Sequence, residues 1–364
     1  MASKLLTKGN EAIAEGAIRA GCQAYFGYPI TPQTELLEYM ARRMPELGRV
    51  FMQAESEVAA INMVYGASAA GARVMTSSSS PGISLKQEGI SYLCAAQLPA
   101  VIVNVMRGGP GLGNIAAAQA DYFQATKGGG HGDYHCIVLA PASVQEAMDL
   151  TTEAFDLADQ YRTPVIILAD ASSGQLMEPV VLRDVQPSLV PKPWALTGAQ
   201  GRPRNVFRTI WMQPERLEAA NLVLQEKYRR IEAEQLRYSG EHLADAEIVV
   251  VAYGTPARVA RTAMRWARQS GLRVGLMRPV SLYPFPYAKV AELASRARAM
   301  LCVELSAGQM IEDVRLAVAG RAPVYLANRL GGVVISPEEV LAALRRVAAG
   351  EAPVYGERAE EGSH

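Results

Sequence analysis

Two runs of almost unbroken apolar residues, Ala100–Met106 and Pro164–Asp170, constrain the fold of this 364-residue chain most strongly. Strands that are apolar along their whole length are buried on both faces, which is typical of a parallel sheet covered by helices. Shorter apolar runs alternate with helical patterns around them, and this alternation predicts a doubly wound α/β fold. The expected strands are Ala24–Gly27, Arg49–Gln53, Arg73–Thr76, Ala100–Met106, Cys136–Ala140 and Pro164–Asp170, and the expected helices are Asn10–Ala20, Pro32–Met44, Ser56–Ala70, Ile83–Ala96 and Ser143–Gln160.

The alternation of strands and helices stops near residue 171 and resumes near Glu247. Prolines punctuate residues 171–205, which indicates an extended linker, and residues 214–238 carry many charges around one apolar stripe, which is typical of a surface helix. A second α/β unit begins near Glu247. Its expected strands are Glu247–Ala252, Leu272–Met277, Met300–Glu304 and Pro323–Leu326, and its expected helices are Thr255–Gln269, Tyr287–Arg298, Gly308–Ala319 and Ser336–Val347, with a loose polar tail from Gly350.

Several helix ends carry capping signals. Asn10, Ser143 and Thr255 stand where an N-cap is expected, because their side-chain oxygens can accept a bond from the first free N–H groups. Ser336 is followed by Pro337 at the first helical position and by Glu339 at the capping-box spacing.

The charge balance narrows the class of partner. The chain has 36 lysines and arginines and 36 aspartates and glutamates, so its formal net charge is zero. No basic excess points to nucleic acid or to an anionic membrane surface. No apolar run reaches the roughly 18–20 residues that span a bilayer, and the sequence has no secretory leader pattern. We therefore expect a soluble cytoplasmic protein that binds neither nucleic acid nor membrane.

The cysteines and histidines predict no metal site in this chain. No two cysteines have the C-x-x-C spacing of zinc ribbons, and their apolar neighbours predict buried, reduced thiols. His131 and His135 are four residues apart, but the residues between them are not those of an H-E-x-x-H helix. The four cysteines are Cys22, Cys94, Cys136 and Cys302.

A polar corner follows the expected strand Ala24–Gly27. It reads Gly27-Tyr28-Pro29-Ile30-Thr31-Pro32, and it places Thr31 as an N-cap and Pro32 as the first residue of the next helix. The unpaired N–H groups of a helix N-terminus can receive a carboxylate or a phosphate. The corner is therefore either an anion site or a well-capped helix start with no ligand.

Two more strand ends carry polar residues. The run Thr76–Gly82 offers several serine hydroxyls, among them Ser80, at the start of a helix. Arg107 stands directly at the carboxyl end of Ala100–Met106, where an arginine can hold a carboxylate through two parallel hydrogen bonds. Ligands of open α/β sheets bind at such strand ends.

The loop after Arg107 also contains a weak match to a dinucleotide fingerprint. Gly111-x-Gly113-x-x-Ala116 has the right spacing, but a Gly-Gly-Pro segment separates it from the strand. Asp133 follows about 20 residues later, yet it precedes the next strand instead of ending it. An NAD(P)-dependent oxidoreductase that uses Gly111–Ala116 is therefore the alternative enzyme class.

A carboxylate is expected in the first turn of helix 56–70. Glu57 stands there, beside the polar corners, and a negative charge at a helix N-terminus is favourable by itself. The residue is either a simple helix-stabilising group or a functional one.

Four motifs occur in order along the chain and together resemble the alpha subunit of the 2-oxoacid:ferredoxin oxidoreductases. They are Tyr28-Pro29-Ile30-Thr31-Pro32, Ser56-Glu57-Val58-Ala59-Ala60, Ser79-Ser80-Pro81-Gly82 and Val105-Met106-Arg107-Gly108-Gly109-Pro110-Gly111. Two further phrases are most similar to subunits of the 2-oxoisovalerate or 2-oxoglutarate type. These are Ser84-Leu85-Lys86-Gln87-Glu88-Gly89 and Lys127-Gly128-Gly129-Gly130-His131-Gly132.

The resemblance implies a domain order. A pyrimidine-binding domain of thiamine diphosphate enzymes would occupy residues 1–185, and a linker with a charged helix would occupy 186–240. A transketolase C-terminal-like α/β domain would follow at 241–348, and a polar tail at 349–364.

The resemblance also implies a mechanism. Glu57 matches the glutamate that hydrogen-bonds the aminopyrimidine of thiamine diphosphate and so helps the thiazolium carbon to lose its proton. That carbon attacks the 2-oxoacid, CO2 leaves, the acyl group goes to coenzyme A and the electrons go to ferredoxin. The implied cofactor contacts are Tyr28, Pro29, Ile30 and Glu57, and the implied substrate contacts are Thr31, Ser80 and Arg107.

Two parts of such an enzyme are missing from the sequence. The diphosphate end of the cofactor needs a Gly-Asp-Gly motif, and Gly132-Asp133-Tyr134 lacks the second glycine. No iron–sulfur cysteine motif is present. The resemblance therefore implies a beta subunit that supplies Mg2+, the diphosphate ligands and a [4Fe-4S] cluster, together with gamma and ferredoxin-like delta subunits. The chain would be active only with these partners.

Some alternatives stay open. A non-catalytic scaffold subunit of the same complex would keep the fold without the chemistry. Neither the 2-oxoacid (pyruvate among the candidates) nor the final electron acceptor, the subunit stoichiometry or the coenzyme A contacts follow from the sequence. Lys86 either meets the distal carboxylate of 2-oxoglutarate or is a solvated helix residue, and His131 is either a pocket or a surface residue.

Overall fold

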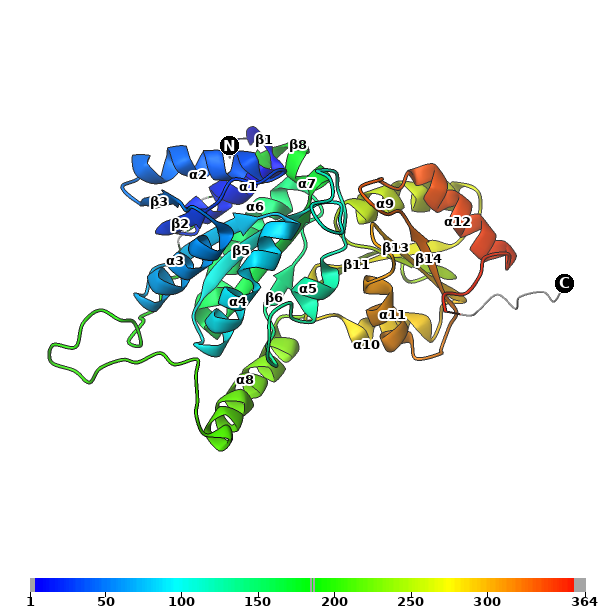
Figure 1. The fold of residues 1–364 in the computed structure, drawn as a ribbon. Coiled ribbons are helices and arrows are strands. Elements are labelled where there is room, and N and C mark those ends of the chain that lie inside the picture. Colours follow the sequence, from blue (N-terminus) through cyan, green and yellow to red (C-terminus); the bar gives the residue numbers. More distant parts are fainter. Residues whose placement is uncertain (1–3, 184, 186, 357–364) are drawn as a thin grey trace.

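The computed structural model describes residues 4–183, 185 and 187–356, so the last part of the expected tail, 357–364, lies outside the described residues. Figure 1 shows two α/β bodies side by side, the first coloured blue to green and the second yellow to red. The strands are β1 (Lys4–Lys8), β2 (Ala24–Gly27), β3 (Val50–Gln53), β4 (Val74–Ser78), β5 (Ala100–Met106), β6 (Ile137–Leu139), β7 (Pro164–Asp170), β8 (Met177–Val181), β9 (Tyr238–Glu241), β10 (Ile248–Val251), β11 (Val274–Pro279), β12 (Ser281–Tyr283), β13 (Ala299–Glu304) and β14 (Val324–Asn328).

The helices alternate with these strands as the sequence predicts for an α/β fold. They are α1 (Gly9–Arg19), α2 (Thr34–Glu46), α3 (Glu57–Ala69), α4 (Ser80–Ala95), α5 (Tyr122–Thr126), α6 (Val144–Tyr161), α7 (Ala171–Gln175), α8 (Pro214–Glu234), α9 (Gly254–Gln269), α10 (Tyr287–Ala294), α11 (Met310–Val318) and α12 (Pro337–Ala349).

The first sheet has seven strands in the order β12-β6-β7-β5-β4-β2-β3. All neighbours are parallel except β12, which runs antiparallel to β6. Helices α3 and α4 pack together, and α1 packs against α2 and α6. The predicted doubly wound sheet is confirmed, with β5 and β7, the two apolar runs, buried along their whole length.

The second sheet has five strands in the order β14-β13-β10-β11-β9. Its four predicted strands are parallel, and the additional strand β9 pairs antiparallel with β11 at one edge. The second α/β unit is therefore confirmed, with an edge strand that the apolar pattern did not reveal because none of its residues is buried.

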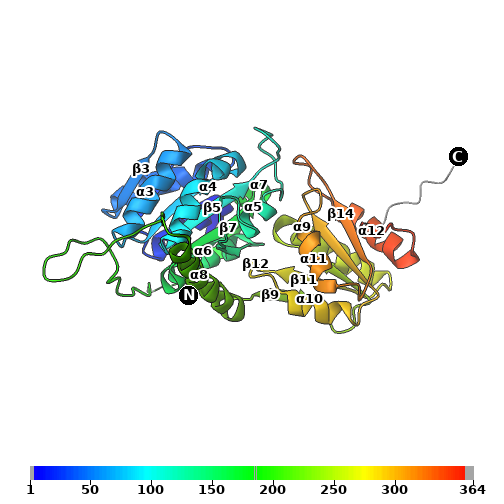
Figure 2. The same cartoon turned by 60° about the horizontal axis from the view of Figure 1, so that its bottom comes forward.

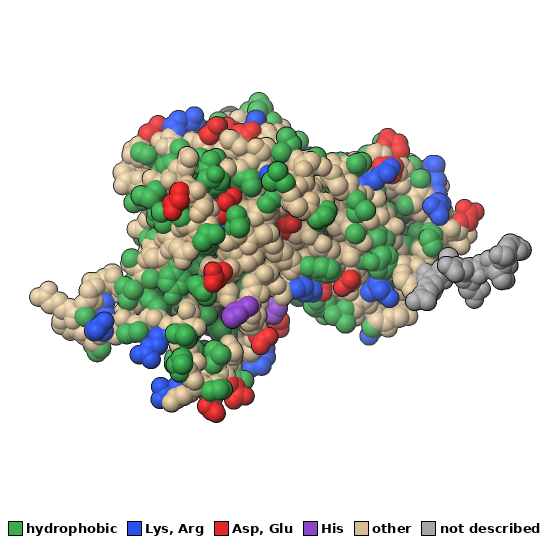
Figure 3. All heavy atoms as spheres, in the orientation of Figure 1, with side chains coloured by type: hydrophobic (Ala, Val, Ile, Leu, Met, Phe, Trp, Pro, Cys, Tyr) green, Lys and Arg blue, Asp and Glu red, His purple; other side chains and the backbone are tan. Residues whose placement is uncertain are grey.

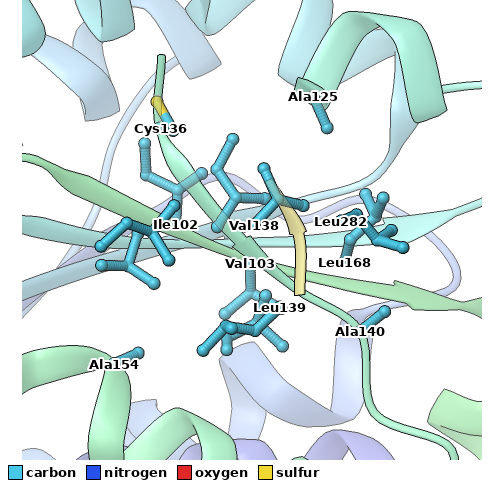
Figure 4. Packing of buried hydrophobic residues seen from close by; sticks show 14 of the residues in the cluster. Ile102, Val103, Ala125, Cys136, Val138, Leu139, Ala140, Ala154, Leu168 and Leu282 are labelled. Carbon is cyan, nitrogen blue, oxygen red and sulfur yellow. The ribbon is translucent and has the colours of Figure 1, made fainter. Parts of the chain in front are cut away.

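Strand β12 joins the two halves of the chain. It follows β11 of the second sheet almost directly, yet Ser281 pairs with Leu139 of β6 in the first sheet. Figure 4 shows Leu282 of β12 in the same apolar cluster as Val103, Val138 and Leu168 of the central strands. A strand far outside residues 1–185 thus completes the sheet of the first body.

The segment expected to be a linker is partly structured. Its first residues form α7 and β8, and β8 pairs with β1 in a two-stranded ribbon. Among the described residues no helix or strand follows until α8, which buries only Leu224, Tyr228 and Ile231, as the single apolar stripe predicts. Figure 1 shows α8 below the first body, after an extended loop, and Figure 2 shows it from the side where it comes forward.

Of the five expected helix caps, Ser143 and Ser336 are confirmed, whereas Asn10, Thr255 and Thr31 are wrong. Ser143 and Ser336 accept the predicted bonds from Glu146 N and Glu339 N. Helix α1 starts one residue before Asn10, whose amide instead donates to Pro32 O (2.8 Å) and to Glu35.

Thr255 is likewise inside its helix, because α9 starts at Gly254. Its hydroxyl and its N–H donate to the carboxylate of Asp170 (2.7 and 3.1 Å), at the end of β7. The residue therefore ties the two bodies together instead of capping a helix. Across the described residues, no helix is long and apolar enough to cross a membrane.

Candidate functional site

Three polar corners lie side by side in the first sheet. Strands β2, β4 and β5 are neighbours, and their carboxyl ends carry the Tyr28–Pro32 turn, the serine run and Arg107. The N-terminus of α3, which follows the adjacent strand β3, brings Glu57 to the same edge. Parallel strands place their carboxyl ends together, which is why residues far apart in sequence meet here.

Glu57 is a buried carboxylate. It stands in the first turn of α3, is 5% exposed and is preceded by Ser56, whose side chain caps the helix at Ala59 N (3.1 Å). Among the described residues no donor bonds to its carboxylate. Gly82 of α4 faces it closely, because a Cβ at Gly82 would lie 2.6 Å from Glu57 Oε1. The carboxylate is favourably placed at the helix dipole and remains available to a ligand.

Arg107 connects two of the corners. Its guanidinium is buried and donates to Thr31 O and to Leu112 O, both at 2.8 Å. Its Nε is buried without a partner among the described residues. A guanidinium has five N–H groups, so three remain after these two bonds. The side chain is therefore held in place and can still bind a carboxylate.

Thr31 is not an N-cap, and Pro32 is not the first helical residue. Helix α2 starts at Thr34 with Gln33 as its cap residue, and Gln33 N bonds back to Ile30 O (3.2 Å) in a tight turn. Thr31 and Pro32 are part of this turn, so the helix begins only at Thr34. The exposed Thr31 hydroxyl caps no helix, and its carbonyl is the group that meets Arg107.

The other residues of the first corner differ in exposure. Tyr28 and Ile30 are half-buried and Pro29 is exposed. The Tyr28 carbonyl accepts a bond from Gln33 Nε2 (3.4 Å), and Gln33 in turn accepts from Ser77 Oγ (2.6 Å). The corner is thus tied to the end of β4.

Ser80 is engaged by the protein itself. Its hydroxyl donates to Asp121 Oδ2 (2.5 Å) and accepts from Arg107 N (3.0 Å). Ser78 and Ser79, by contrast, have buried hydroxyls with no partner among the described residues. The sequence prediction singled out Ser80, whereas these two neighbours are the free hydroxyls of the run.

Asp121 is a site residue that the sequence prediction missed. It lies just before α5 and accepts bonds from Ser80 and from Asn104 Nδ2 (2.9 Å) of β5. Burial raises the pKa of this carboxyl. No local motif marks it, because only the fold brings the residue to the end of β5.

Lys86 is fully buried, so of its two alternatives the solvated helix residue is wrong. Its Nζ donates to Thr76 Oγ1 (2.7 Å) and Ser77 O (2.9 Å) of β4. Burial lowers the pKa of Lys86 to about 7, and the nearby negative charge of Glu57 opposes this effect. His131, by contrast, is exposed.

The described residues bring together no group of three or more histidine, cysteine, aspartate or glutamate side chains that could hold a metal ion. His135 stacks on Tyr283 with ring centroids 4.2 Å apart. All four cysteines are buried with free thiols, as predicted.

The dinucleotide fingerprint lacks its structural context. Residues 111–116 form an irregular loop, and the chain after them bonds back to the strand end through a bridge between Arg107 and Ala117. No helix starts at the second glycine, so no helix N-terminus faces a pyrophosphate there. The alternative of an NAD(P)-dependent enzyme is not favoured.

Two family models match the chain. Residues 15–238 match the thiamine diphosphate-binding domain of pyruvate flavodoxin/ferredoxin oxidoreductases. Residues 246–340 match core domain II of pyruvate:ferredoxin oxidoreductases.

Curated relatives cover nearly the whole chain. The ketoisovalerate oxidoreductase subunit VorB of Methanothermobacter thermautotrophicus is 54% identical over 346 residues, which are 94% of this chain and 97% of the relative. The 2-oxoglutarate synthase subunits KorA of the same organism and of Methanocaldococcus jannaschii are 36% and 37% identical, over 94% and 92% of this chain and 98% and 97% of the relatives.

Solved structures agree with the fold. The 2-oxoglutarate:ferredoxin oxidoreductase of Magnetococcus marinus matches with a TM-score of 0.82 and 26% identity, over 94% of this chain and 65% of that chain. A split-gene transketolase matches in fold alone, with a TM-score of 0.59 and 15% identity, over 94% of this chain and 96% of that one. The chain belongs to the 2-oxoacid:ferredoxin oxidoreductase family, whose members are subunits of multi-subunit enzymes with a thiamine diphosphate-binding domain.

Proposed function

We propose that this chain is the alpha subunit of a 2-oxoacid:ferredoxin oxidoreductase and holds the aminopyrimidine half of thiamine diphosphate together with the 2-oxoacid. The assembled enzyme converts the 2-oxoacid anion, coenzyme A and two oxidised ferredoxins to acyl-CoA, CO2, a proton and two reduced ferredoxins. The bond between the carboxylate and the 2-oxo carbon breaks, and a carbon–sulfur bond to coenzyme A forms.

The observation that carries this proposal is the 54% identity to a ketoisovalerate oxidoreductase subunit over 97% of its length. The 2-oxoglutarate synthase subunits are more distant, at 36% and 37%. We infer a branched-chain 2-oxoacid as the substrate. The burial of Lys86 supports this choice, because its ammonium faces β4 and does not offer itself to a distal carboxylate.

The residues at the strand ends fit the pyrimidine half of the cofactor. Among the described residues no donor bonds the buried carboxylate of Glu57, and the buried hydroxyls of Ser78 and Ser79 have no partner there either. Tyr28, Pro29 and Ile30 would line the same place. When bound, thiamine diphosphate supplies the carbon nucleophile that attacks the 2-oxo group and holds the electrons released with CO2.

The chain's own residues then have distinct tasks. Glu57 holds or releases a proton at the pyrimidine N1′ position, and Arg107 orients the substrate carboxylate with its three remaining N–H groups. Thr31 offers its free hydroxyl beside that guanidinium. Ser80 positions Arg107 through its bond to Arg107 N, so we assign it a supporting role.

Partner subunits would complete the enzyme. The sequence has no Gly-Asp-Gly motif, and the proposed beta subunit supplies Mg2+, the diphosphate ligands and a [4Fe-4S] cluster. Figure 3 shows apolar side chains gathered on the face that carries α3 and α4. Val58, next to Glu57, and Leu85, next to Lys86, are about half exposed, and Leu112 and Ile115 are more so. A partner docked there would close the site, with gamma and delta subunits and ferredoxin further out.

Purification of the native complex and a panel of 2-oxoacids test the proposal. With coenzyme A and a viologen dye as acceptor, 2-oxoisovalerate should give the highest kcat/KM, followed by other branched-chain acids. A preference for 2-oxoglutarate would overturn the substrate class, and saturable NAD binding by the chain alone would revive the dinucleotide alternative.

A further inference from the structure

Lys86 is a buried cation that the proposed mechanism does not use. It lies in the middle of α4, is fully buried, and bonds only two neutral acceptors, Thr76 Oγ1 and Ser77 O. An ammonium has three N–H donors, and it forms no ion pair with the described residues. Burial of an unpaired charge is unfavourable, so the ammonium of Lys86 lowers the stability of the folded chain.

The geometry places Lys86 on the face of α4 that packs against α3, the helix that carries Glu57. Gly82, Lys86 and Gly89 are spaced i, i+4 and i+7, so they share one face of α4. A Cβ on Gly82 would lie 2.6 Å from Glu57 Oε1, and a Cβ on Gly89 would lie 2.6 Å from the side chain of Ile61, one turn further along α3. Lys86 therefore lies between two points at which α4 touches α3.

Glycines on either side of Lys86 let the two helices approach closely. This approach seals the ammonium from water and leaves the end of β4 as its only polar contact among the described residues. The negative charge of Glu57 raises the pKa of Lys86 against the effect of burial, so the two groups interact through space without direct contact.

Other groups around the pair have partners of their own. Tyr25 of β2 contacts Ser77 Oγ (2.6 Å), Asp121 bonds Ser80, and Arg107 bonds carbonyl oxygens. The strand β4 that lies under Lys86 contributes only neutral residues. Within the described part of the chain, neither Lys86 nor Glu57 forms an ion pair, and no other charged group bonds either of them.

We propose that Lys86 is a positioning residue that acts through Glu57, its buried charge setting how Glu57 exchanges a proton with the bound cofactor. This inference rests on the proposed function and adds a residue to it. The ammonium favours the ionised carboxylate, and its bonds to Thr76 and Ser77 fix the serine run beside it. Lys86 itself touches neither cofactor nor substrate.

A double-mutant cycle on cofactor binding tests the proposal. The assembled complex is freed of thiamine diphosphate, and the Kd for the cofactor is measured for wild type, Lys86→Met, Glu57→Gln and the double variant. If Lys86 acts through Glu57, the substitution Lys86→Met changes Kd when Glu57 is intact and has little effect when Glu57→Gln is already present. We expect a coupling of at least about five-fold in Kd, and equal effects in both backgrounds would overturn the proposal.

Two variants separate charge from structure. Thr76→Val removes a hydrogen-bond acceptor but keeps the ammonium, and its effect on Kd should be the same with and without Glu57→Gln. Lys86→Gln keeps donors without the charge and replaces Lys86→Met if the latter fails to assemble. The pH profile of kcat gives a second readout, because a component with a midpoint near pH 7 should disappear in both Lys86 variants. An unchanged profile contradicts the proposal.

Failure of the proposed function would look different. In that case Glu57→Gln would retain full turnover, whatever happens at Lys86. If Glu57→Gln is inactive and the cycle shows no coupling, only the role of Lys86 is wrong.

Discussion

The three buried charged side chains of the site are held mainly by neutral groups. Arg107 bonds two carbonyl oxygens, Lys86 bonds a hydroxyl and a carbonyl, and Glu57 accepts no bond from the described residues. Had they paired directly, they would have neutralised one another. Their separation leaves both charge and hydrogen-bonding capacity for a ligand.

Glu57→Gln should lower turnover of the assembled complex by about 10²–10⁴-fold, because an amide cannot take part in proton transfer. The measurement is steady-state kcat with a viologen acceptor. Binding of partner subunits should be unchanged, which gel filtration checks. Near wild-type turnover would remove Glu57 from the mechanism.

Arg107→Ala should lower kcat/KM for the 2-oxoacid by roughly 10–100-fold, because a charge-assisted hydrogen bond contributes about 1.5–3 kcal/mol. Arg107→Lys keeps the charge but loses the planar fork, so it should recover only part of this loss. Thermal unfolding of both variants controls for the bonds to Thr31 and Leu112. An unchanged KM and kcat would exclude substrate binding by this residue.

The low pKa of Lys86 should make the free energy of unfolding depend on pH. Burial lowers its pKa to about 7 from 10.5, so between these values the unfolded chain binds a proton that the native chain does not. The free energy of unfolding therefore rises with pH between about 7 and 10.5, by up to roughly 4 kcal/mol. The difference in unfolding free energy between wild type and Lys86→Met, measured in urea, should change by this amount from pH 7 to 10, and a constant difference would contradict it.

For single residues, the sequence predicts which ones lie at the same edge of the sheet, but it does not predict which atoms each side chain contacts. Strand ends alone placed Thr31, Glu57 and Arg107 at one edge of the sheet. The state of Lys86 depends on the approach of α3 to α4, which no local pattern encodes. The prediction of Thr31 as a cap was wrong because the turn that includes Gln33 is stabilised by Ser77, a residue of another strand.

Among the elements, α4 is the one that shapes the site most. It starts at Ser80, passes Glu57 at Gly82 and covers β4 at Lys86. A side chain at Gly82 would collide with both Ser78 and Glu57, so the helix can lie this close only with glycine at that position. The spacing of glycines on one helix face thus fixes how deep the carboxylate is buried.

Gly82→Ala should lower turnover by at least about ten-fold, because its Cβ would lie 2.0 Å from Ser78 Oγ and 2.6 Å from Glu57 Oε1. Gly66→Ala in α3 is a matched control, since no atom lies within 4 Å of its Cβ position. That control should raise the free energy of unfolding by about 0.5–1 kcal/mol through helix propensity. Equal turnover for Gly82→Ala and wild type would show that Glu57 tolerates displacement.

The long helices and the apolar strands were predictable, including the short strands β2, β3, β6 and β10, but four other short strands were not. Periodicity identified the central strands and the long helices to within a few residues. Strands β1, β8, β9 and β12 have three to five residues each, and they are strands only because a distant partner supplies their hydrogen bonds.

On the scale of the whole molecule, a cluster around Asp313 joins the two bodies. This buried carboxylate of α11 accepts bonds from Tyr122 (2.6 Å), Lys127 (2.5 Å) and Tyr287 (2.5 Å). Tyr122 and Lys127 belong to the first body and Asp313 belongs to the second, so these bonds join the two bodies. Gln119 adds a second bridge, since it bonds Tyr253 O and Leu305 N.

Asp313→Asn should lower the free energy of unfolding by roughly 2–4 kcal/mol, because three donors lose a charged and buried acceptor. Glu226→Gln is the control, since Glu226 pairs with Arg229 on the exposed surface and its loss should lower stability by less than about 1 kcal/mol. Urea unfolding of both variants measures the difference. Equal midpoints would mean that the two bodies do not depend on this contact.

Strand β12 has a consequence for how the protein is made. The first sheet lacks its last strand until Ser281–Tyr283 has been synthesised, roughly a hundred residues after β7. At about 5–20 residues per second, the ribosome delivers it some 5–20 s later. During that interval β6 presents an open edge on the nascent chain, and this edge is where a chaperone would be needed most.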